Sequence, residues 1–518
     1  MTIVSAPAHD AAPGVALARG AGVNLLALAA SNFRGLFTLS IAWLMGSEAL
    51  GIFALSWTAT DLIATVAMLG LDSALLTKIP RQMALNDAAG ARSIWRHATR
   101  LALAVSVAAA AAGAPLVLFL PGIGTGVRAD LATPMALMLV AVPGVVLYRV
   151  SNAASRGMKV MHHDLYSRGL AEWTVSLVVF LGAWASGAGR LAPSWAVVAG
   201  GTASGVTAFL LARRLFAPER STRPAVGAGT SAPYPMTQLL GDSLPIAAYT
   251  LINNLIMRLD VLMLGAYVGR APGLTLETLG IYAAAVEVAG GLRKVNQAFN
   301  PIFIPIVSAQ GARGDREGMQ ESYGYLGRWM LAVLLPSVAV LALAGSAIMS
   351  IFGPGFDRGA VWLAIVGAAS ALNVFAGAGE SLIMIERPSL NVLNSSSACL
   401  AAVVAGWWLI PELGPAGAAI AQLVPYALLA VLRHVELRTF FAWEWQWRPL
   451  MRPLVAVLLA LPIALLVRML VEGDRAGIAA AILFVAAYLG AWRVLGLEAQ
   501  DRLVIGGFRG TPSLQVER

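Results

Sequence analysis

Charged residues are scarce in this sequence. Aspartate, glutamate, lysine and arginine make up 12% of its 518 residues, where about 25% is usual in soluble domains. Hydrophobic residues make up 58%, and the mean hydropathy is +0.75. So few charges cannot cover the water-facing surface of a globular protein of this length. The composition therefore excludes a cytosolic enzyme, a secreted disulfide scaffold and a disordered chain, and it predicts an integral membrane protein.

Cysteine is almost absent, and so are the motifs of common catalytic sites. Cys399 is the single cysteine, which excludes an intramolecular disulfide and a cysteine-based metal cluster. The sequence also lacks a phosphate-binding glycine loop, the spacing of zinc ligands and a nucleophile triad. We therefore predict a protein that is not an enzyme, with no catalytic residues, no metal and no cofactor, and one that does not itself hydrolyse ATP.

Long apolar runs stand where a soluble protein would carry charge. A transmembrane helix needs about 20 mainly apolar residues, and transmembrane barrel strands of about 10 alternating residues do not fit these runs. We expect an all-α integral membrane protein with about fourteen transmembrane helices. The predicted spans lie near residues 21–45, 50–76, 98–120, 132–150, 167–188, 192–212, 242–268, 279–307, 326–348, 359–385, 389–410, 414–432, 450–470 and 477–495.

The basic residues orient these spans. When the N-terminus is placed in the cytoplasm, most of the 36 lysines and arginines fall in cytoplasmic loops, among them Arg149, Arg328 and Arg433. By the positive-inside rule, this predicts that both termini are cytoplasmic. It also explains the net charge of +9 without a nucleic-acid partner. The opposite face carries five basic residues: Arg128, Arg190, Arg270, Arg358 and Arg475.

A long polar connection and a weak internal repeat predict two lobes. Residues 213–240 are rich in proline, glycine, serine and threonine, as linkers are. The sequence EALGIFA at 48–54 is similar to ETLGIYA at 277–283, and inverted or parallel repeats are common in transporters. The predicted parts are a cytoplasmic tail 1–20, an N-lobe 21–212, the linker 213–240, a C-lobe 241–435, two further helices 436–495 and a cytoplasmic tail 496–518.

Two arginines interrupt the spans that open the predicted lobes. Arg34 and Arg258 both fall inside apolar runs, where a charge costs about 2.5–3.5 kcal/mol on insertion scales. One interpretation is a cationic cavity that holds an anionic group such as a pyrophosphate, because the guanidinium is a rigid, permanently charged fork of donors. The alternative is a pair of salt bridges to Asp61 and Asp260. The asparagines Asn32 and Asn254 accompany the two arginines as candidate polar cavity residues.

The predicted eighth span carries a polar stripe. Its members Arg293, Asn296, Gln297 and Asn300 recur at i, i+3, i+4 and i+7, which is one face of a helix. Such a face in the membrane lines water, substrate or a partner helix, or it marks a headgroup-level helix end. Lys294 is a further candidate cavity cation on this span.

Carboxylates inside the spans are the candidates for a coupling ion or proton. Asp61, Glu287 and Glu380 lie at depths where carboxylates serve this purpose in pumps, and the alternative for each is a salt bridge. We expect Glu172, close to a span end, to reach toward the membrane surface.

Four segments resemble a known family. They are 37–81, which contains LGLDSAL, 243–269, which contains MRLDVLMLG, 279–308 and 352–377. In order and spacing they resemble the polysaccharide transporters, or Wzx-type lipid-linked oligosaccharide flippases, of the MOP exporter superfamily. The resemblance covers most of residues 20–435, and the last two spans are generic. It implies two six-helix lobes around a central cationic cavity, with cavity arginines in the first and seventh spans at Arg34 and Arg258.

The resemblance also implies a function and partners. It predicts a flippase that moves an undecaprenyl-pyrophosphate-linked oligosaccharide, an O-antigen (lipopolysaccharide) or exopolysaccharide unit, to the periplasmic leaflet by alternating access. The expected partners are this substrate, the lipid bilayer and other polysaccharide-assembly proteins. Alternatives are an ion-coupled small-molecule (drug or cation) exporter of the same superfamily and a non-transporting scaffold for polysaccharide synthesis. A glycan polymerase or ligase normally needs a large periplasmic loop, which the short predicted outer loops exclude.

Overall fold

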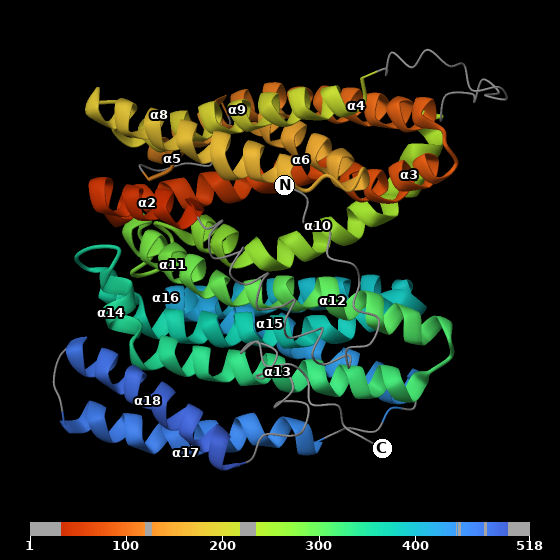
Figure 1. Ribbon diagram of the computed structural model, residues 1–518. Helices are drawn as coiled ribbons and strands as arrows, with labels where there is room; N and C mark the ends of the chain where they lie inside the picture. The colour runs from red at the N-terminus through yellow and green to blue at the C-terminus, as the bar shows by residue number, and fades with distance from the viewer. Residues whose placement is uncertain are drawn as a thin grey trace, which may run out of the picture. The chain divides into compact units, whose positions relative to one another are not determined.

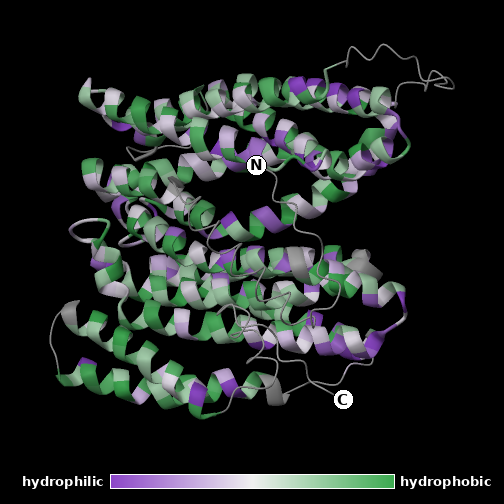
Figure 2. Ribbon diagram, in the orientation of Figure 1, coloured by the Kyte–Doolittle hydropathy of each residue, from purple (hydrophilic) through white to green (hydrophobic). Residues whose placement is uncertain are grey.

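The described chain is built from α-helices. The computed structural model describes residues 33–119, 127–217, 235–441, 443, 447–470 and 474–495, and these residues include no strand. The predicted all-helical membrane class is therefore confirmed. Hydrophobic residues dominate the helices, and hydrophilic ones gather toward the ends of α12 and α13 at their connection (Figure 2).

The chain divides into two compact units. The first consists of Phe33–Ala283 with Gly406–Ala418, and the second contains Ala284–Ala405 with the described residues of Ala419–Arg518. This division falls after residue 283, not in the predicted linker 213–240, because the helix that follows the linker packs against the first helices of the chain. The predicted lobe boundaries remain a proposal.

The first unit carries the helices from α2 to α10 and the beginning of α11 (Figure 1). Their bounds are α2 Phe33–Met68, α3 Leu71–Ala84, α4 Ala88–Phe119, α5 Val127–Leu139, α6 Val142–Gly157, α7 His162–Asp164, the π-helix η1 Leu165–Glu172, α8 Trp173–Ala185, the 3-10 turn η2 Gly189–Leu191, α9 Ala192–Leu215, α10 Met236–Tyr267 and α11 Leu276–Ala289.

The second unit carries the remaining helices, except that residues 406–418 of α16 belong to the first unit. Their bounds are η3 Gly290–Leu292, α12 Arg293–Ala312, α13 Arg316–Leu343, α14 Gly345–Ser350, η4 Phe356–Gly359, α15 Ala360–Glu386, α16 Pro388–Phe441, α17 Trp447–Leu470 and α18 Asp474–Val494.

Ten helices among the described residues are long and apolar enough to cross a membrane. Two of these helices, in α2 and α16, are longer than one span. The longer one, Ser389–Phe440 in α16, has 52 residues, or about 78 Å at 1.5 Å per residue. It contains Gly414 at φ 58°, and α2 contains Gly46 at φ 82°, a left-handed conformation that glycine adopts without a Cβ clash. Each of these two helices is therefore two helices joined at a glycine. The count of fourteen spans stays a prediction.

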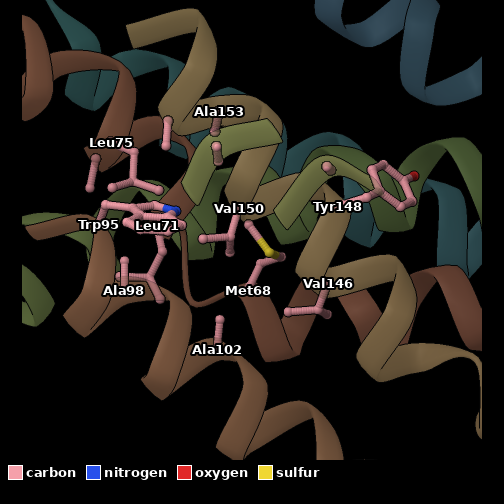
Figure 3. Close-up of a cluster of buried hydrophobic side chains, with 14 of the residues drawn as sticks. Met68, Leu71, Leu75, Trp95, Ala98, Ala102, Val146, Tyr148, Val150 and Ala153 are labelled. Carbon is pink, nitrogen blue, oxygen red and sulfur yellow. The ribbon is translucent and has the colours of Figure 1, made fainter. Parts of the chain in front are cut away.

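The core of the first unit lies where α3, α4 and α6 meet (Figure 3). Leu71, Leu75 and Val150 are fully buried there. The indole of Trp95 stacks on the ring of Phe216 at a centroid distance of 5.0 Å. Aromatic pairs at such distances add about 0.5–1.5 kcal/mol beyond the area that they bury.

Glycines bring α6 and α9 into close contact. A Cβ at Gly144 would lie 2.6 Å from the carbonyl oxygen of Gly201, and one at Gly205 would lie 2.6 Å from the carbonyl oxygen of Gly144. Gly201 and Gly205 are one turn apart on α9, the small-xxx-small pattern that lets transmembrane helices approach each other. The contact fixes α6, which carries part of the candidate site.

We expect Gly144→Leu to destabilise the first unit. Its side chain would meet backbone atoms, which cannot move aside as a flexible side chain does, so the cost should be at least the about 1–3 kcal/mol that is typical of overpacking. Thermal unfolding in detergent measures the effect. Gly182→Leu is the matched control, because nothing lies within 4 Å of a Cβ at Gly182. Equal melting temperatures for the two variants would contradict the expectation.

The last two helices form a hairpin in the second unit. α17 and α18 pack against each other and against α13. Fully buried alanines, among them Ala456, Ala460 and Ala480, let the two helices approach around Phe484. The hydroxyl of Tyr488 donates a hydrogen bond to the carbonyl of Ala332 on α13 at 2.9 Å. The two generic spans at the end of the sequence are thus joined to the second unit by both apolar and polar contacts.

Candidate functional site

Three helices of the first unit bring two arginines and one aspartate together. Asp61 lies on α2, Arg149 on α6 and Arg258 on α10, and α2 packs against both other helices. Nη2 of Arg149 pairs with Oδ1 of Asp61, and Nη2 of Arg258 lies 3.3 Å from Oδ2. We call these three residues the Asp61 cluster.

Thr65 extends the Asp61 cluster by one helical turn. Its hydroxyl donates to the carbonyl of Asp61 at 2.9 Å and accepts from Nη1 of Arg149 at 3.1 Å. The guanidinium of Arg149 is therefore oriented by two groups on α2. A preoriented guanidinium loses less conformational entropy when it binds an anion than a free one does.

The side chains of the Asp61 cluster are partly screened from solvent. Asp61 and Arg149 lie well before the ends of their helices. The side chain of Asp61 is 13% exposed, that of Arg149 23% and that of Arg258 25%. Asp61 precedes the end of α2 by seven residues and Arg149 precedes the end of α6 by eight, or roughly 10–12 Å along each helix. Two guanidinium groups and one carboxylate carry a formal charge of +1. Charges at this depth favour a bound anion, because a low dielectric strengthens each ionic contact.

Arg258 and Asp61 form a salt bridge, and the cavity role of Arg258 stays a prediction. Their salt bridge was one of the two interpretations of the sequence, and it is present. The other expected carboxylate partner, Asp260, accepts a hydrogen bond from the hydroxyl of Tyr282 at 2.8 Å and is 7% exposed. Asn254 lies one turn before Arg258 on α10 and is half-buried.

The remaining two predicted residues of the first lobe are described in part or not at all. Arg34 lies in α2, as a span residue should, and its side chain is outside the described residues. Asn32 lies outside the described residues altogether.

Arg149 was missed by the sequence analysis. It was expected in a cytoplasmic loop, but it lies in α6, within the apolar helical segment Asp130–Gly157. Its cytoplasmic side stays a prediction. The predicted span ended at residue 150, where charge begins to recur. A signal was nevertheless present: Val146, Val150, Ala153 and Ala154 keep a helical apolar spacing past Arg149, and all four are fully buried.

The residues of the polar stripe of α12 have different surroundings: some face another helix, and others are exposed. Asn296 faces α15, since a Cβ at Gly377 would lie 2.8 Å from its Nδ2. The Oδ1 atoms of Asn296 and Asn300 are buried and have no hydrogen-bond partner among the described residues, whereas Gln297 is exposed. Arg293 begins α12 and is half-buried, as is Lys294. The stripe lies in the second unit, and its role remains a proposal.

Glu380 forms an ion pair in the second unit. Its Oε2 accepts from Nη2 of Arg433 at 2.9 Å, and Nη1 of Arg433 donates to the carbonyl of Ala376 at 3.0 Å. Arg433 and Arg328 were expected in cytoplasmic loops, but they lie in the helices α16 and α13 and are 2% and 1% exposed. The side of the membrane assigned to them stays a prediction. The third coupling candidate, Glu287, is half-buried on α11.

Among the described residues, no three His, Cys, Asp or Glu side chains come together as metal ligands do.

An aromatic pocket in the first unit holds a carboxylate. Phe37, Trp57, Trp173 and Ser176 line it together with Glu172. Glu172 is 9% exposed, so the expectation that it reaches the membrane surface is wrong. It is the last residue of the π-helix η1.

A polar network joins α6 to the segment that follows it. Nδ2 of Asn152 donates to Oδ1 of Asp164 and to Oγ of Ser167, both at 2.9 Å. Nδ1 of His163 lies 2.9 Å from Oγ of Ser155. Burial, and secondly the neighbouring His162, lower the pKa of His163 below its ordinary value. The imidazole is therefore neutral in the folded protein at neutral pH.

Acid should destabilise the protein through His163. A depressed pKa in the folded state contributes stability above the ordinary pKa of about 6.5, and this contribution is lost as the pH falls through the folded-state pKa. We expect the melting temperature of the wild type to fall more between pH 7 and pH 5 than that of His163→Asn. Parallel melting curves over this range would show that His163 makes no such contribution.

Comparison with known proteins identifies the family. Residues 17–308, more than half of the 518-residue chain, match the family described as polysaccharide biosynthesis protein. The chain belongs to this polysaccharide biosynthesis protein family. The match confirms the resemblance on which the sequence analysis relied. No curated protein matches the sequence.

Solved structures show the fold of this family member. It is similar to an inward-facing multidrug resistance MATE family transporter of the MOP superfamily, at 15% identity over 79% of this chain and 94% of that chain, with a TM-score of 0.66. A MOP superfamily transporter from Pyrococcus furiosus, described as having a binding pocket of reverse polarity, is 16% identical over 83% of this chain and 96% of that one, with a TM-score of 0.61. The polysaccharide biosynthesis protein described here is thus a multi-pass membrane protein with the MOP transporter fold.

Proposed function

We propose that this protein is a flippase for a lipid-linked oligosaccharide. Its substrate is an undecaprenyl-pyrophosphate-linked O-antigen or exopolysaccharide unit, which it moves from the cytoplasmic to the periplasmic leaflet of the bacterial inner membrane. The observation that carries the proposal is the Asp61 cluster. Family membership supports the polysaccharide, and two guanidinium groups at one place support the pyrophosphate, because guanidinium groups bind phosphate oxygens in a bidentate manner.

The physical problem is the headgroup. A charged pyrophosphate with its sugars cannot cross about 30 Å of hydrocarbon unaided, while the prenyl chain can stay in lipid. In the proposed mechanism, phosphate oxygens replace the Asp61 carboxylate as acceptors for Arg149 and Arg258. The two guanidinium groups exchange one set of ion pairs for another, so the buried cations remain paired throughout. The protein opens to each side in turn, as two-lobe transporters do.

Asp61 has a specific role in this proposal. With no substrate bound, its carboxylate neutralises one of two cations that would otherwise be costly to bury. With substrate bound, it competes with the phosphates for the same donors. This competition limits the affinity, which allows release on the far side. Binding that is too tight in both leaflets would slow a flippase.

Translocation in proteoliposomes tests the proposal. The purified full chain is reconstituted with an undecaprenyl-pyrophosphate oligosaccharide that carries a fluorescent label, and transfer is measured by access of a membrane-impermeant quencher. We expect protein-dependent transfer, and a slower transfer when unlabelled prenyl pyrophosphate competes. Absence of transfer from well-folded protein, with and without proton and sodium gradients, would contradict the proposal.

A second candidate function has one observation in its favour. An ion-coupled exporter of organic cations needs carboxylates and aromatic faces, since cations are attracted to aromatic rings. The pocket around Glu172 offers both. This candidate predicts that organic cations bind with an affinity that Glu172→Gln removes, and that prenyl pyrophosphate does not compete with them.

A further inference from the structure

A pocket in the second unit opens between the ends of four helices. It is lined from α13, α15 and α16, from Trp443 in the connection after α16, and from Leu450 of α17. These are the beginning of α13, the end of α16 and the beginning of α17, which the distribution of basic residues predicts to lie in the cytoplasmic leaflet. The pocket belongs to the second unit alone, and the Asp61 cluster belongs to the first. We call it the α13–α17 pocket.

The wall of this pocket is apolar and aromatic. Tyr323 and Trp443 are in ring contact at a centroid distance of 5.7 Å, and Phe375, Leu437 and Leu450 complete the wall. Trp443 is 7% and Leu437 4% exposed, so these side chains already pack against the protein. A wall of this kind suits a hydrocarbon chain and not a sugar, which would need more hydrogen-bonding groups.

A glycine keeps the pocket open. Gly327 on α13 is one of its lining residues. A Cβ at Gly327 would lie 3.5 Å from Cδ2 of Leu450 and 3.6 Å from Cε2 of Phe375. These are ordinary van der Waals distances, so alanine fits there. A leucine at this position would extend further, into the space that these two residues border.

Arg438 gives the rim of the pocket a positive charge. Arg438 and His434 line it from the last turns of α16. Phe440 follows Arg438 by two residues. The guanidinium carbon of Arg387 lies 4.6 Å from the centroid of the Phe440 ring. No carboxylate is among the described lining residues. The carboxylate of Glu436, on the same helix, accepts a hydrogen bond from Asn394 at 2.8 Å.

We propose that the α13–α17 pocket binds an anionic phospholipid of the cytoplasmic leaflet. The acyl chain lies along Tyr323, Phe375 and Leu450, and the phosphate lies at Arg438 and His434. Basic pockets between transmembrane helices on the cytoplasmic side bind anionic headgroups, and here the apolar wall continues from the basic rim. The bound lipid joins the end of α16 and the beginning of α17 to α13. It therefore stabilises the second unit and is not transported.

The test measures lipid-dependent thermal stability of the full chain in detergent. Phosphatidylglycerol is titrated against phosphatidylcholine, with undecaprenyl phosphate as a third arm. We expect phosphatidylglycerol to raise the melting temperature at lower concentrations than either of the others. Equal midpoints for phosphatidylglycerol and phosphatidylcholine would overturn the proposal, and a lower midpoint for undecaprenyl phosphate that Gly327→Leu removes would assign the pocket to the polyprenyl substrate instead.

Two pairs of variants separate the rim from the wall. Arg438→Gln should raise the phosphatidylglycerol midpoint about tenfold, because one charge-assisted hydrogen bond is lost, while Arg316→Gln, an exposed change at the beginning of α13, should leave it unchanged. Gly327→Leu should remove the lipid effect, and Gly327→Ala should retain it. An unchanged midpoint in Arg438→Gln contradicts the proposal even where Gly327→Leu fails to fold. None of these measurements involves translocation, so their outcome is independent of the flippase test.

Discussion

Arg258→Gln should weaken binding of prenyl pyrophosphate by roughly 10- to 150-fold. The change removes one charged donor group from the Asp61 cluster, and a hydrogen bond to a charged group contributes about 1.5–3 kcal/mol. The glutamine keeps much of the side-chain volume, so packing on α10 changes little. The affinity is measured by competition against the fluorescent substrate in nanodiscs. Arg149→Gln should have an effect of the same size.

Asp61→Asn distinguishes an anion site from a structural salt bridge. If the arginines serve the substrate, removing their competing carboxylate should make binding tighter than in the wild type, although the fold loses stability. If the cluster only joins α2, α6 and α10, the variant should lose stability with no gain in affinity.

Arg270→Gln, in the connection after α10, is the matched control for arginine removal. Equal affinities in Arg258→Gln and Arg270→Gln would contradict the role of Arg258.

Glu380→Leu should destabilise the second unit by about 3–5 kcal/mol, the typical cost of removing one partner of a buried ion pair. The side chain of Arg433 is 3% exposed, so its charge would stay buried, with the carbonyl of Ala376 as a neutral acceptor. Chemical denaturation in mixed micelles, followed by circular dichroism, measures the loss.

A double-mutant cycle tests whether the pair is coupled. Because Glu380→Leu/Arg433→Met removes both charges, it should be less destabilised than Glu380→Leu alone. Additive losses in the double variant would show that the two side chains contribute independently. Glu380→Gln tests whether Glu380 is a coupling carboxylate. If Glu380 alternately binds an ion and Arg433, this variant should lose ion-dependent transport.

The helical membrane class could be predicted from composition, because a chain with so few charges cannot cover a surface that faces water and must face the lipid bilayer. Arg258 and Asp61 could be found because each charge interrupts an apolar run, and a charge there needs a partner or a polar cavity. The choice between these alternatives could not be made from sequence. It depends on which residues face each other across helices, and Asp61 and Arg258 are 197 positions apart.

Arg149, Arg433 and Glu172 show where the sequence analysis failed. Each lies near the end of an apolar run, and hydropathy assigns such positions to loops or to the membrane surface. The helices continue past them because helix length is set by packing as well as by hydropathy. Val150 and Ala153 continue the buried face of α6 beyond Arg149, and Glu172 is buried at the end of the π-helix before α8. The kinks at Gly46 and Gly414 are likewise backbone features that composition alone does not indicate.

The most direct test of the proposed function is translocation by the variant Arg149→Gln/Arg258→Gln. Wild type, this variant and Arg270→Gln are reconstituted at equal density with the labelled undecaprenyl-pyrophosphate oligosaccharide. The proposal predicts transfer by the wild type and by Arg270→Gln, and none above protein-free liposomes by the double variant. Transfer by a folded double variant at the wild-type rate would show that the Asp61 cluster does not carry the pyrophosphate.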